Sequence, residues 1–163
     1  MLPANRLLKT AKGEQRMMNY ESLADGGFAS GSMMGSGGFI VLDDTQCVVK
    51  HTYTLARFYR HESCGQCSPC REGTGWMEKI LLKIDSGKGS MSDIDLLWDI
   101  QRKIEGNTIC PLGDAAAWPV AAAIRHFRDE FEWHINNPED CLRKNYGLAG
   151  YADEIHVPVL SNE

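Results

Sequence analysis

The sequence lacks a long apolar run, a secretory signal and a positive net charge, and each absence excludes a class of protein. Its longest nearly uncharged apolar stretch, residues 115–124, is about half the length that a membrane-spanning helix needs. Residues 1–12 have no apolar core of the kind found in signal peptides, which argues against an oxidising compartment and against disulfides. With a net charge of -5, the chain offers no broad cationic surface for phosphate backbones. We therefore expect no membrane span and no nucleic-acid partner.

The chain does have a group of regularly spaced cysteines. Cys64, Cys67 and Cys70 lie at three-residue intervals in the run ESCGQCSPCREG, and Cys110, about forty residues later, is followed directly by Pro111. A Cys-x2-Cys-x2-Cys loop suits three corners of a cuboidal 4Fe-4S cluster, and in bacterial ferredoxins the distant ligand also precedes a proline. The spacing predicts that Cys64, Cys67, Cys70 and Cys110 are the complete ligand set of one 4Fe-4S cluster.

Other uses of these cysteines fit the pattern less well. A structural zinc site usually takes its thiolates as two separated pairs, whereas this chain has a triplet and a single cysteine. A thioredoxin-type redox site needs one dithiol and leaves the third cysteine without a role. We expect Cys47, in a short β-like run, to be a buried hydrophobe and Cys141 to be a surface or packing thiol. We interpret His61 as a helix-end residue beside the site, and His126 and His134 as helix-surface or core residues.

The composition divides near residue 50. Small residues dominate residues 26–38, and the strand-like residues 39–42 follow. Because a dinucleotide-binding loop follows a strand and this glycine-rich loop precedes one, we interpret it as backbone packing. We divide the chain into a β-rich segment over residues 1–50, a helical domain over 51–140 and a tail over 141–163.

After residue 50 the apolar spacing is helical and predicts four helices. The first covers about residues 52–61 and ends at the cysteine loop. The second contains the apolar positions between Trp76 and Ile84 and stops at the glycine-containing residues 85–89. Arg71 begins this second helix, where its charge could stabilise an electron-rich cluster or simply be solvated.

The last two helices have recognisable ends. Ser92 is a plausible N-cap for the third, and Gly106 is its C-terminal signal. The fourth runs from about residue 114 to 134, with Asp114 as its N-cap or first-turn acid. Pro119 falls in its first turns and predicts a kink or a shifted start. The expected fold class is mainly α, a four-helix bundle with the 4Fe-4S cluster at the end where the two cysteine loops converge.

Three runs together resemble a known family. They are Y-x-x-x-RFY-x-HESCG-x-C-x-PCREG at residues 53–73, EG-x-x-x-CPL-x-DA at residues 105–115, and the Trp-Pro pair at residues 118–119, where x marks positions that take no part in the resemblance. The chain closely resembles the NADH-binding flavoprotein subunit of respiratory complex I, NADH:quinone oxidoreductase, over roughly residues 18–137. The run MGSGG, residues 34–38, resembles the end of that subunit's β-grasp (SLBB) domain. The segment before the bundle is therefore expected to be a partial β-grasp segment.

The resemblance implies a function for the four cysteines. In this family they hold the 4Fe-4S cluster that takes electrons from FMN, which NADH has reduced, and passes them to the enzyme's iron–sulfur chain. Family members begin with a large α/β domain that binds FMN and NADH, and these 163 residues do not contain it. The chain therefore resembles the C-terminal portion of the subunit, and we expect it to be inactive with NADH in isolation and to contain no catalytic residue.

The implied partners are the other peripheral-arm subunits of complex I, including the flavin and NADH domain and the neighbouring iron–sulfur subunits. The implied location is cytoplasmic, on the inner face of the cell membrane through the complex, or on the matrix side in mitochondria.

Two alternatives stay open. One is a fragment of the diaphorase subunit of an NAD-linked hydrogenase or formate dehydrogenase, although these subunits often carry extra ferredoxin-like cysteine motifs. The other is a zinc-stabilised interaction module without catalysis.

Overall fold

The computed structural model describes residues 8–9, 15–16, 40–42 and 46–137. The chain divides into two compact units, residues 1–42 and 43–163. In the first unit, strands β1 (Leu8–Lys9) and β2 (Gln15–Arg16) pair antiparallel, with Leu8 opposite Arg16. The glycine-rich loop, most of the expected β-grasp segment (residues 1–7, 10–14 and 17–39) and Cys141 lie outside the described residues.

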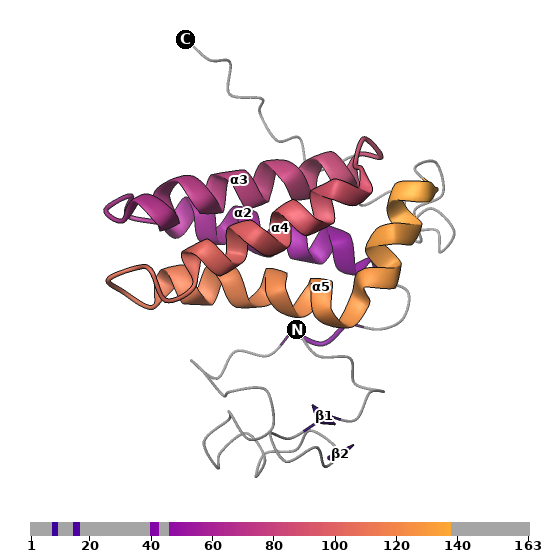
Figure 1. Ribbon diagram of the computed structural model, residues 1–163, viewed down its shortest axis with the longest axis horizontal. Helices are drawn as coiled ribbons and strands as arrows, with labels where there is room; N and C mark the ends of the chain where they lie inside the picture. Colours follow the sequence, from indigo (N-terminus) through magenta and orange to yellow (C-terminus); the bar gives the residue numbers. More distant parts are fainter. Residues whose placement is uncertain (1–7, 10–14, 17–39, 43–45, 138–163) are drawn as a thin grey trace. The chain divides into compact units, whose positions relative to one another are not determined.

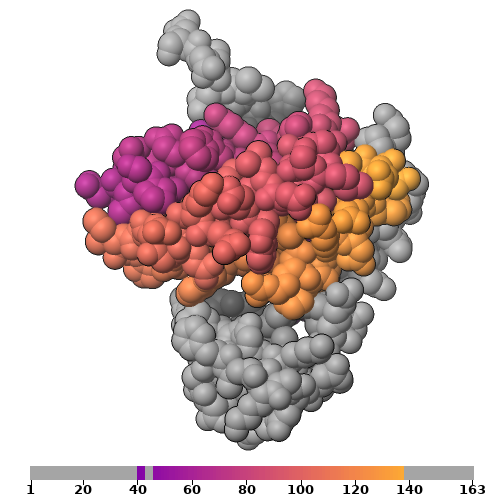
Figure 2. Space-filling model, viewed as in Figure 1, coloured from indigo at the N-terminus to yellow at the C-terminus, as the bar shows by residue number. Residues whose placement is uncertain are grey.

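The described part of the second unit is helical, as expected. It contains helices α2 (Val48–Glu62), α3 (Ser68–Asp85), α4 (Met91–Ile104) and α5 (Leu112–Asn136). Helix α2 packs on α3, α3 on α4, α4 on α5, and α5 returns to α2, with a further contact between α3 and α5 (Figure 1). Side chains of α3, α4 and α5 together cover the face seen in Figure 2. None of the helices in the described ranges is long and apolar enough to cross a membrane.

The core follows from apolar residues at helical spacing. Met77, Leu81 and Ile84 of α3 are completely buried, and Ile94 and Leu97 supply the matching stripe of α4. Helix α5 contributes mainly small side chains, which let it approach its neighbours closely, followed by a fully buried aromatic ring: Ala116, Ala117, Val120, Ala123, Ile124 and Phe131. His134 is also buried in this core, as expected for a core histidine.

Helix α2 begins earlier than the sequence indicates. The β-like run over residues 46–49 was expected to be extended, but Val48 and Val49 are helical and only the N-cap residue Cys47 is extended. The carboxylate of Glu130, in α5, accepts the Val48 N–H at 2.7 Å and satisfies the start of the helix. This tertiary cap and the burial of both valines override their β propensity. Cys47 is 1% exposed, which confirms the expectation of a buried hydrophobe.

The expected start of α4 and the expected kink in α5 are also corrected. The N-cap of α4 is Ser90 rather than Ser92, because the Ser90 N–H donates to the Asp93 carboxylate at 2.7 Å. Within α5 the non-helical backbone angles belong to Phe127 rather than to Pro119, and the helix bends sharply towards its end (Figure 1). The expected kink at Pro119 is therefore wrong, since the backbone around this residue keeps helical angles.

Candidate functional site

The two cysteine-bearing loops lie at the same end of the bundle. The α2–α3 loop, residues 63–67, and the α4–α5 loop, residues 105–111, are neighbours at the left in Figure 1. A direct contact joins them, because the Ile109 N–H donates to Cys67 Sγ at 3.4 Å. The convergence of the loops is therefore observed in the structure, although Cys67 and Ile109 are 42 positions apart.

The four cysteines differ in exposure. Cys70, in the first turn of α3, is buried, Cys67 is half-buried as the N-cap of α3, and Cys64 and Cys110 are exposed. All four are free thiols. Among the described residues, no three His, Cys, Asp or Glu side chains are gathered closely enough to hold a metal ion. The structure thus brings Cys67 beside the Cys110 loop but does not bring the four sulfurs into a common ligand sphere.

Polar contacts order the α2–α3 loop. Ser63 Oγ lies 3.2 Å from Cys70 Sγ, and the Gly65 N–H donates to the same hydroxyl at 3.3 Å. Arg71 Nη1 donates to the Gly65 carbonyl at 2.9 Å, and Nη2 donates to Ser68 Oγ at 3.3 Å. Gly65 has φ of +75°, which is strained for other residues. The Arg71 side chain therefore acts as a brace across the loop, rather than as a merely solvated charge.

The Cys110 loop is braced as well. Thr108 Oγ1 donates to the Cys110 carbonyl at 3.0 Å, and the Gly106 N–H donates to the Asp114 carboxylate at 2.7 Å. Asp114 is thus a first-turn acid of α5, as expected, and it also ties the end of α4 to the start of α5. Trp118 Nε1 donates to Glu105 across the same corner at 2.8 Å.

Helix dipoles favour negative charge at this end of the bundle. Helix α3 begins immediately after Cys67, and α5 begins two residues after Cys110. The free N–H groups at a helix N-terminus carry partial positive charge and stabilise nearby anions. Four soft sulfur donors close to two such termini suit an iron–sulfur cluster with thiolate ligands.

The remaining candidate residues, His61 and Cys47, belong to the two ends of helix α2. His61 contacts Glu62 at 2.9 Å and its side chain is 86% exposed, so it is a surface residue at the end of α2. Cys47 is at the other end of the 15-residue helix α2, about 20 Å away along the helix axis. Neither residue joins the site in this structure.

The sequence interpretation missed several residues that support the site. Ser63 and Trp118 lie in the runs that carry the family resemblance, and this was the only signal for them. Thr108 and Gly113 had no local signal, since their roles depend on contact between the Cys110 loop and α5. A Cβ on Gly113 would lie 2.5 Å from Thr108 Cγ2.

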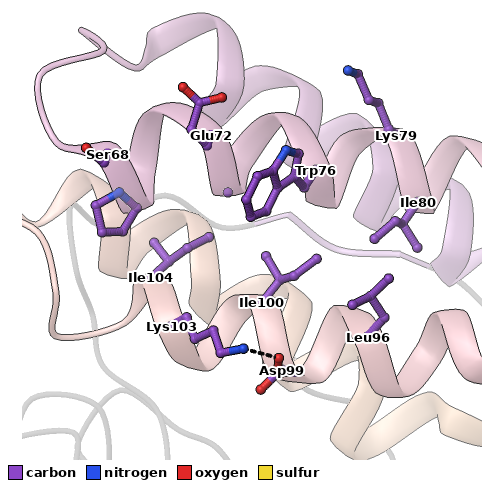
Figure 3. Close-up of a pocket in the computed structure, with 12 residues that line it drawn as sticks. Ser68, Glu72, Trp76, Lys79, Ile80, Leu96, Asp99, Ile100, Lys103 and Ile104 are labelled. Atoms are coloured by element: carbon purple, nitrogen blue, oxygen red, sulfur yellow. Dashed lines mark hydrogen bonds and ion pairs between the residues drawn. The ribbon is translucent and has the colours of Figure 1, made fainter.

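A groove of about 700 Å³ runs between α3 and α4 and begins at Ser68 and Pro69, beside the cysteine loop. Trp76 and Ile80 from α3 face Leu96 and Ile100 from α4 across it (Figure 3). Trp76 is 54% exposed and Leu96 46% exposed, which is unusual for large apolar side chains. The cysteine motif gives no indication of this groove.

These features define a class: a small helical domain with a cysteine-rich end of the iron–sulfur type. A family model described as the NADH-ubiquinone oxidoreductase-F iron-sulfur binding region matches residues 50–134, and the chain belongs to this family. The expected resemblance and the expected 4Fe-4S cofactor are thereby confirmed. The four individual ligands stay a prediction.

The relatives and solved structures agree with the family. The chain is 46% identical over 129 residues to the F-type NADH-quinone oxidoreductase subunit of Rickettsia bellii, covering 79% of this chain and 30% of the relative. It is 44% identical over 126 residues to an F-type NADH-quinone oxidoreductase subunit of Rhizobium meliloti, covering 77% and 28%. The chain thus spans about 30% of the length of these relatives.

Two crystal structures of NAD+-reducing [NiFe]-hydrogenase are similar to this chain. The air-oxidised state matches with a TM-score of 0.56 and 32% identity, covering 69% of this chain and 20% of that chain. The H2-reduced state matches with a TM-score of 0.62 and 27% identity, covering 91% and 25%. These likenesses correspond to the hydrogenase alternative raised by the sequence.

Proposed function

We propose that this chain is an electron-transfer module in which Cys64, Cys67, Cys70 and Cys110 hold one 4Fe-4S cluster. When bound there, the cluster would supply one-electron transfer from FMN, reduced by NADH, to the iron–sulfur chain of an NADH:quinone oxidoreductase. The observation that carries the proposal is the contact between Cys67 Sγ and the Ile109 N–H, which joins the two cysteine loops inside the family-matched region.

The residues of the chain have distinct tasks in this function. The cluster supplies one-electron storage. Cys70, in the first turn of α3, anchors the cluster to the bundle, and the exposed Cys64 and Cys110 face the solvent, where a partner could approach. Arg71 and Thr108 fix the two loops through the Gly65 and Cys110 carbonyls, so that little rearrangement is needed between oxidation states.

The proposed partners are the other peripheral-arm subunits of complex I, including the flavin and NADH domain and the neighbouring iron–sulfur subunits. The proposed location is cytoplasmic, on the inner face of the cell membrane, or the matrix side in mitochondria. The chain provides the relay and its partners provide hydride chemistry, because hydride transfer needs a flavin beside a nicotinamide pocket. The purified chain with FMN should therefore show no NADH:ferricyanide reductase activity, and flavin-dependent turnover without a partner would contradict this assignment.

A second candidate is the diaphorase subunit of an NAD-linked hydrogenase, which the two hydrogenase structures favour. The high identity to the F-type subunits of NADH-quinone oxidoreductase favours the first candidate. Mass spectrometry of the native complex that contains this chain distinguishes them, since hydrogenase subunits would accompany it in one case and quinone-reductase subunits in the other.

The ligand set is tested on anaerobically purified chain. Iron, sulfide and zinc analysis, with low-temperature EPR after dithionite reduction, should show one 4Fe-4S cluster in the wild type and its loss or conversion in Cys110→Ser. Cys47→Ala is the matched control and should keep full iron, because Cys47 lies at the opposite end of α2. A colourless, zinc-loaded protein would support the interaction-module alternative instead, and a normal cluster in Cys110→Ser would overturn the ligand assignment.

A further inference from the structure

Ser63 occupies a special position beside the proposed ligands. It is the C-cap of α2, with extended backbone angles and its N–H bonded to the Arg60 carbonyl at 3.4 Å. Its hydroxyl lies 3.2 Å from the sulfur of Cys70. Cys70 is only 6% exposed, so water has little access with which to replace this hydroxyl. The contact is therefore a fixed feature of the protein rather than a solvated one.

The direction of this hydrogen bond follows from the neighbouring groups. A hydroxyl has one proton to donate and lone pairs that accept. The Gly65 N–H already donates to Ser63 Oγ, at 3.3 Å, and so occupies one of its two lone pairs. A cysteine that binds a metal is a thiolate and has no proton to give. When Cys70 is a cluster ligand, Ser63 must be the donor and Cys70 Sγ the acceptor.

Arg71 keeps this arrangement in place. The Gly65 N–H donates to Ser63 Oγ at 3.3 Å, and with φ of +75° at Gly65 the carbonyl of the same residue accepts from Arg71 Nη1 at 2.9 Å. The Gly65 N–H thus contacts the Ser63 hydroxyl from one side, and Arg71 holds Gly65 in place. The hydroxyl proton is directed to Cys70 Sγ on the other side.

We propose that Ser63 is a positioning residue that raises the reduction potential of the cluster through an O–H···S hydrogen bond to Cys70. This inference rests on the proposed function. The reduced cluster carries one more negative charge than the oxidised cluster, and a donor to a ligand sulfur stabilises the more negative state to a greater degree. Loss of the donor makes reduction harder, while the four thiolate ligands remain.

The test is an EPR-monitored redox titration of the full chain with its cluster. Ser63→Ala should keep full iron and sulfide but shift the one-electron equilibrium toward the oxidised state by on the order of tenfold, about 59 mV in potential. Ser63→Thr retains the hydroxyl and should restore a potential close to that of the wild type. Ser86→Ala is the matched control. Ser86 is the C-cap at the far end of α3, where its hydroxyl donates to the Lys83 carbonyl.

Ser63→Val separates loss of the hydroxyl from loss of side-chain volume, because valine and threonine have the same shape. A lower potential in the Ala and Val variants, with a normal value in Thr, supports the proposal. Wild-type potentials in Ala and Val overturn it. Loss of the cluster in both also overturns it, because a hydroxyl that only tunes the potential is not needed to hold iron. A wild-type chain that binds no 4Fe-4S cluster would instead refute the proposed function.

Discussion

At the scale of single residues, Glu130 shows how one side chain sets the start of a distant helix. Cys47 makes no side-chain cap, so the first N–H groups of α2 depend on another partner. Glu130 accepts the Val48 N–H at 2.7 Å from a half-buried position on α5. Burial raises the pKa of the Glu130 carboxyl above its ordinary value of 4.5, and the nearby Asp129 charge raises it further, against the opposing effect of the Val48 N–H.

The raised pKa predicts how stability depends on pH. A carboxyl with a higher pKa in the folded state than in the unfolded state contributes stability that is fully present below the unfolded value and is lost as pH rises through the folded value. We therefore expect the free energy of unfolding of the wild type to fall, relative to Glu130→Gln, as pH increases from about 4.5 through the raised pKa. Urea unfolding across that range measures the difference.

Glu130→Gln keeps an acceptor for the Val48 N–H without the charge. It serves as the reference because the side chain at position 130 then does not titrate. Glu130→Ala removes the acceptor and, measured against Glu130→Gln, should cost about 1 kcal/mol at all these pH values, a typical amount for a lost N-cap. The explanation is wrong if the wild type gains stability relative to Glu130→Gln as the pH rises, or if Glu130→Ala unfolds at the same urea concentration as Glu130→Gln.

At the scale of elements, Gly113 sets how closely α5 approaches the Cys110 loop. A Cβ at this position would lie 2.5 Å from Thr108 Cγ2 and 2.9 Å from Thr108 Cβ, closer than atoms in proteins pack. Thr108 must therefore move, and its bond to the Cys110 carbonyl moves with it. Gly113→Ala should destabilise the chain by about 1–3 kcal/mol, the usual cost of overpacking, and reduce the iron content.

Gly75→Ala is the matched control for this change. Gly75 lies within α3, and its added Cβ would meet Arg60 at ordinary contact distances of 3.6 and 3.9 Å. Since alanine favours helix over glycine by about 1 kcal/mol, this variant should be as stable as the wild type or more so, with full iron. Urea unfolding and iron analysis of both variants decide the matter. Equal stability and equal iron in Gly113→Ala would show that the Cys110 loop tolerates the displacement.

The elements also show what the sequence could and could not predict. The cysteine spacing and the helical periodicity depend on neighbouring residues, so the four helices and the loop that carries Cys64, Cys67 and Cys70 were predictable. The start of α2 was not, because its cap, Glu130, is 82 positions away from Val48. The contact of Ser63 with Cys70 was missed for a similar reason, since it depends on how the α2–α3 turn folds back onto α3.

At the scale of the whole helical unit, the cluster would join two loops that connect different pairs of helices. Cys64, Cys67 and Cys70 belong to the α2–α3 connection and Cys110 to the α4–α5 connection, and the direct contact between these loops is the bond from Ile109 to Cys67 at 3.4 Å. A ligand that binds the folded state and not the unfolded state adds its binding free energy to the stability of the fold. Cluster binding should therefore stabilise all four helices, since each adjoins one of the two loops.

We expect the melting temperature of the cluster-loaded chain to exceed that of the apo chain by on the order of 5 °C or more, which corresponds to a gain of roughly 1 kcal/mol or more in a domain of this size. Anaerobic thermal unfolding followed by circular dichroism measures this difference.

Apo Cys110→Ser should melt like the apo wild type and gain less after reconstitution, because serine cannot complete the ligand set. Hydrogen exchange should show the added protection first in residues 63–70 and 106–113, and little in residues 86–90 at the far end of α3. Equal melting temperatures of apo and loaded wild-type chains would mean that the helices hold the two loops in place without help from the cluster.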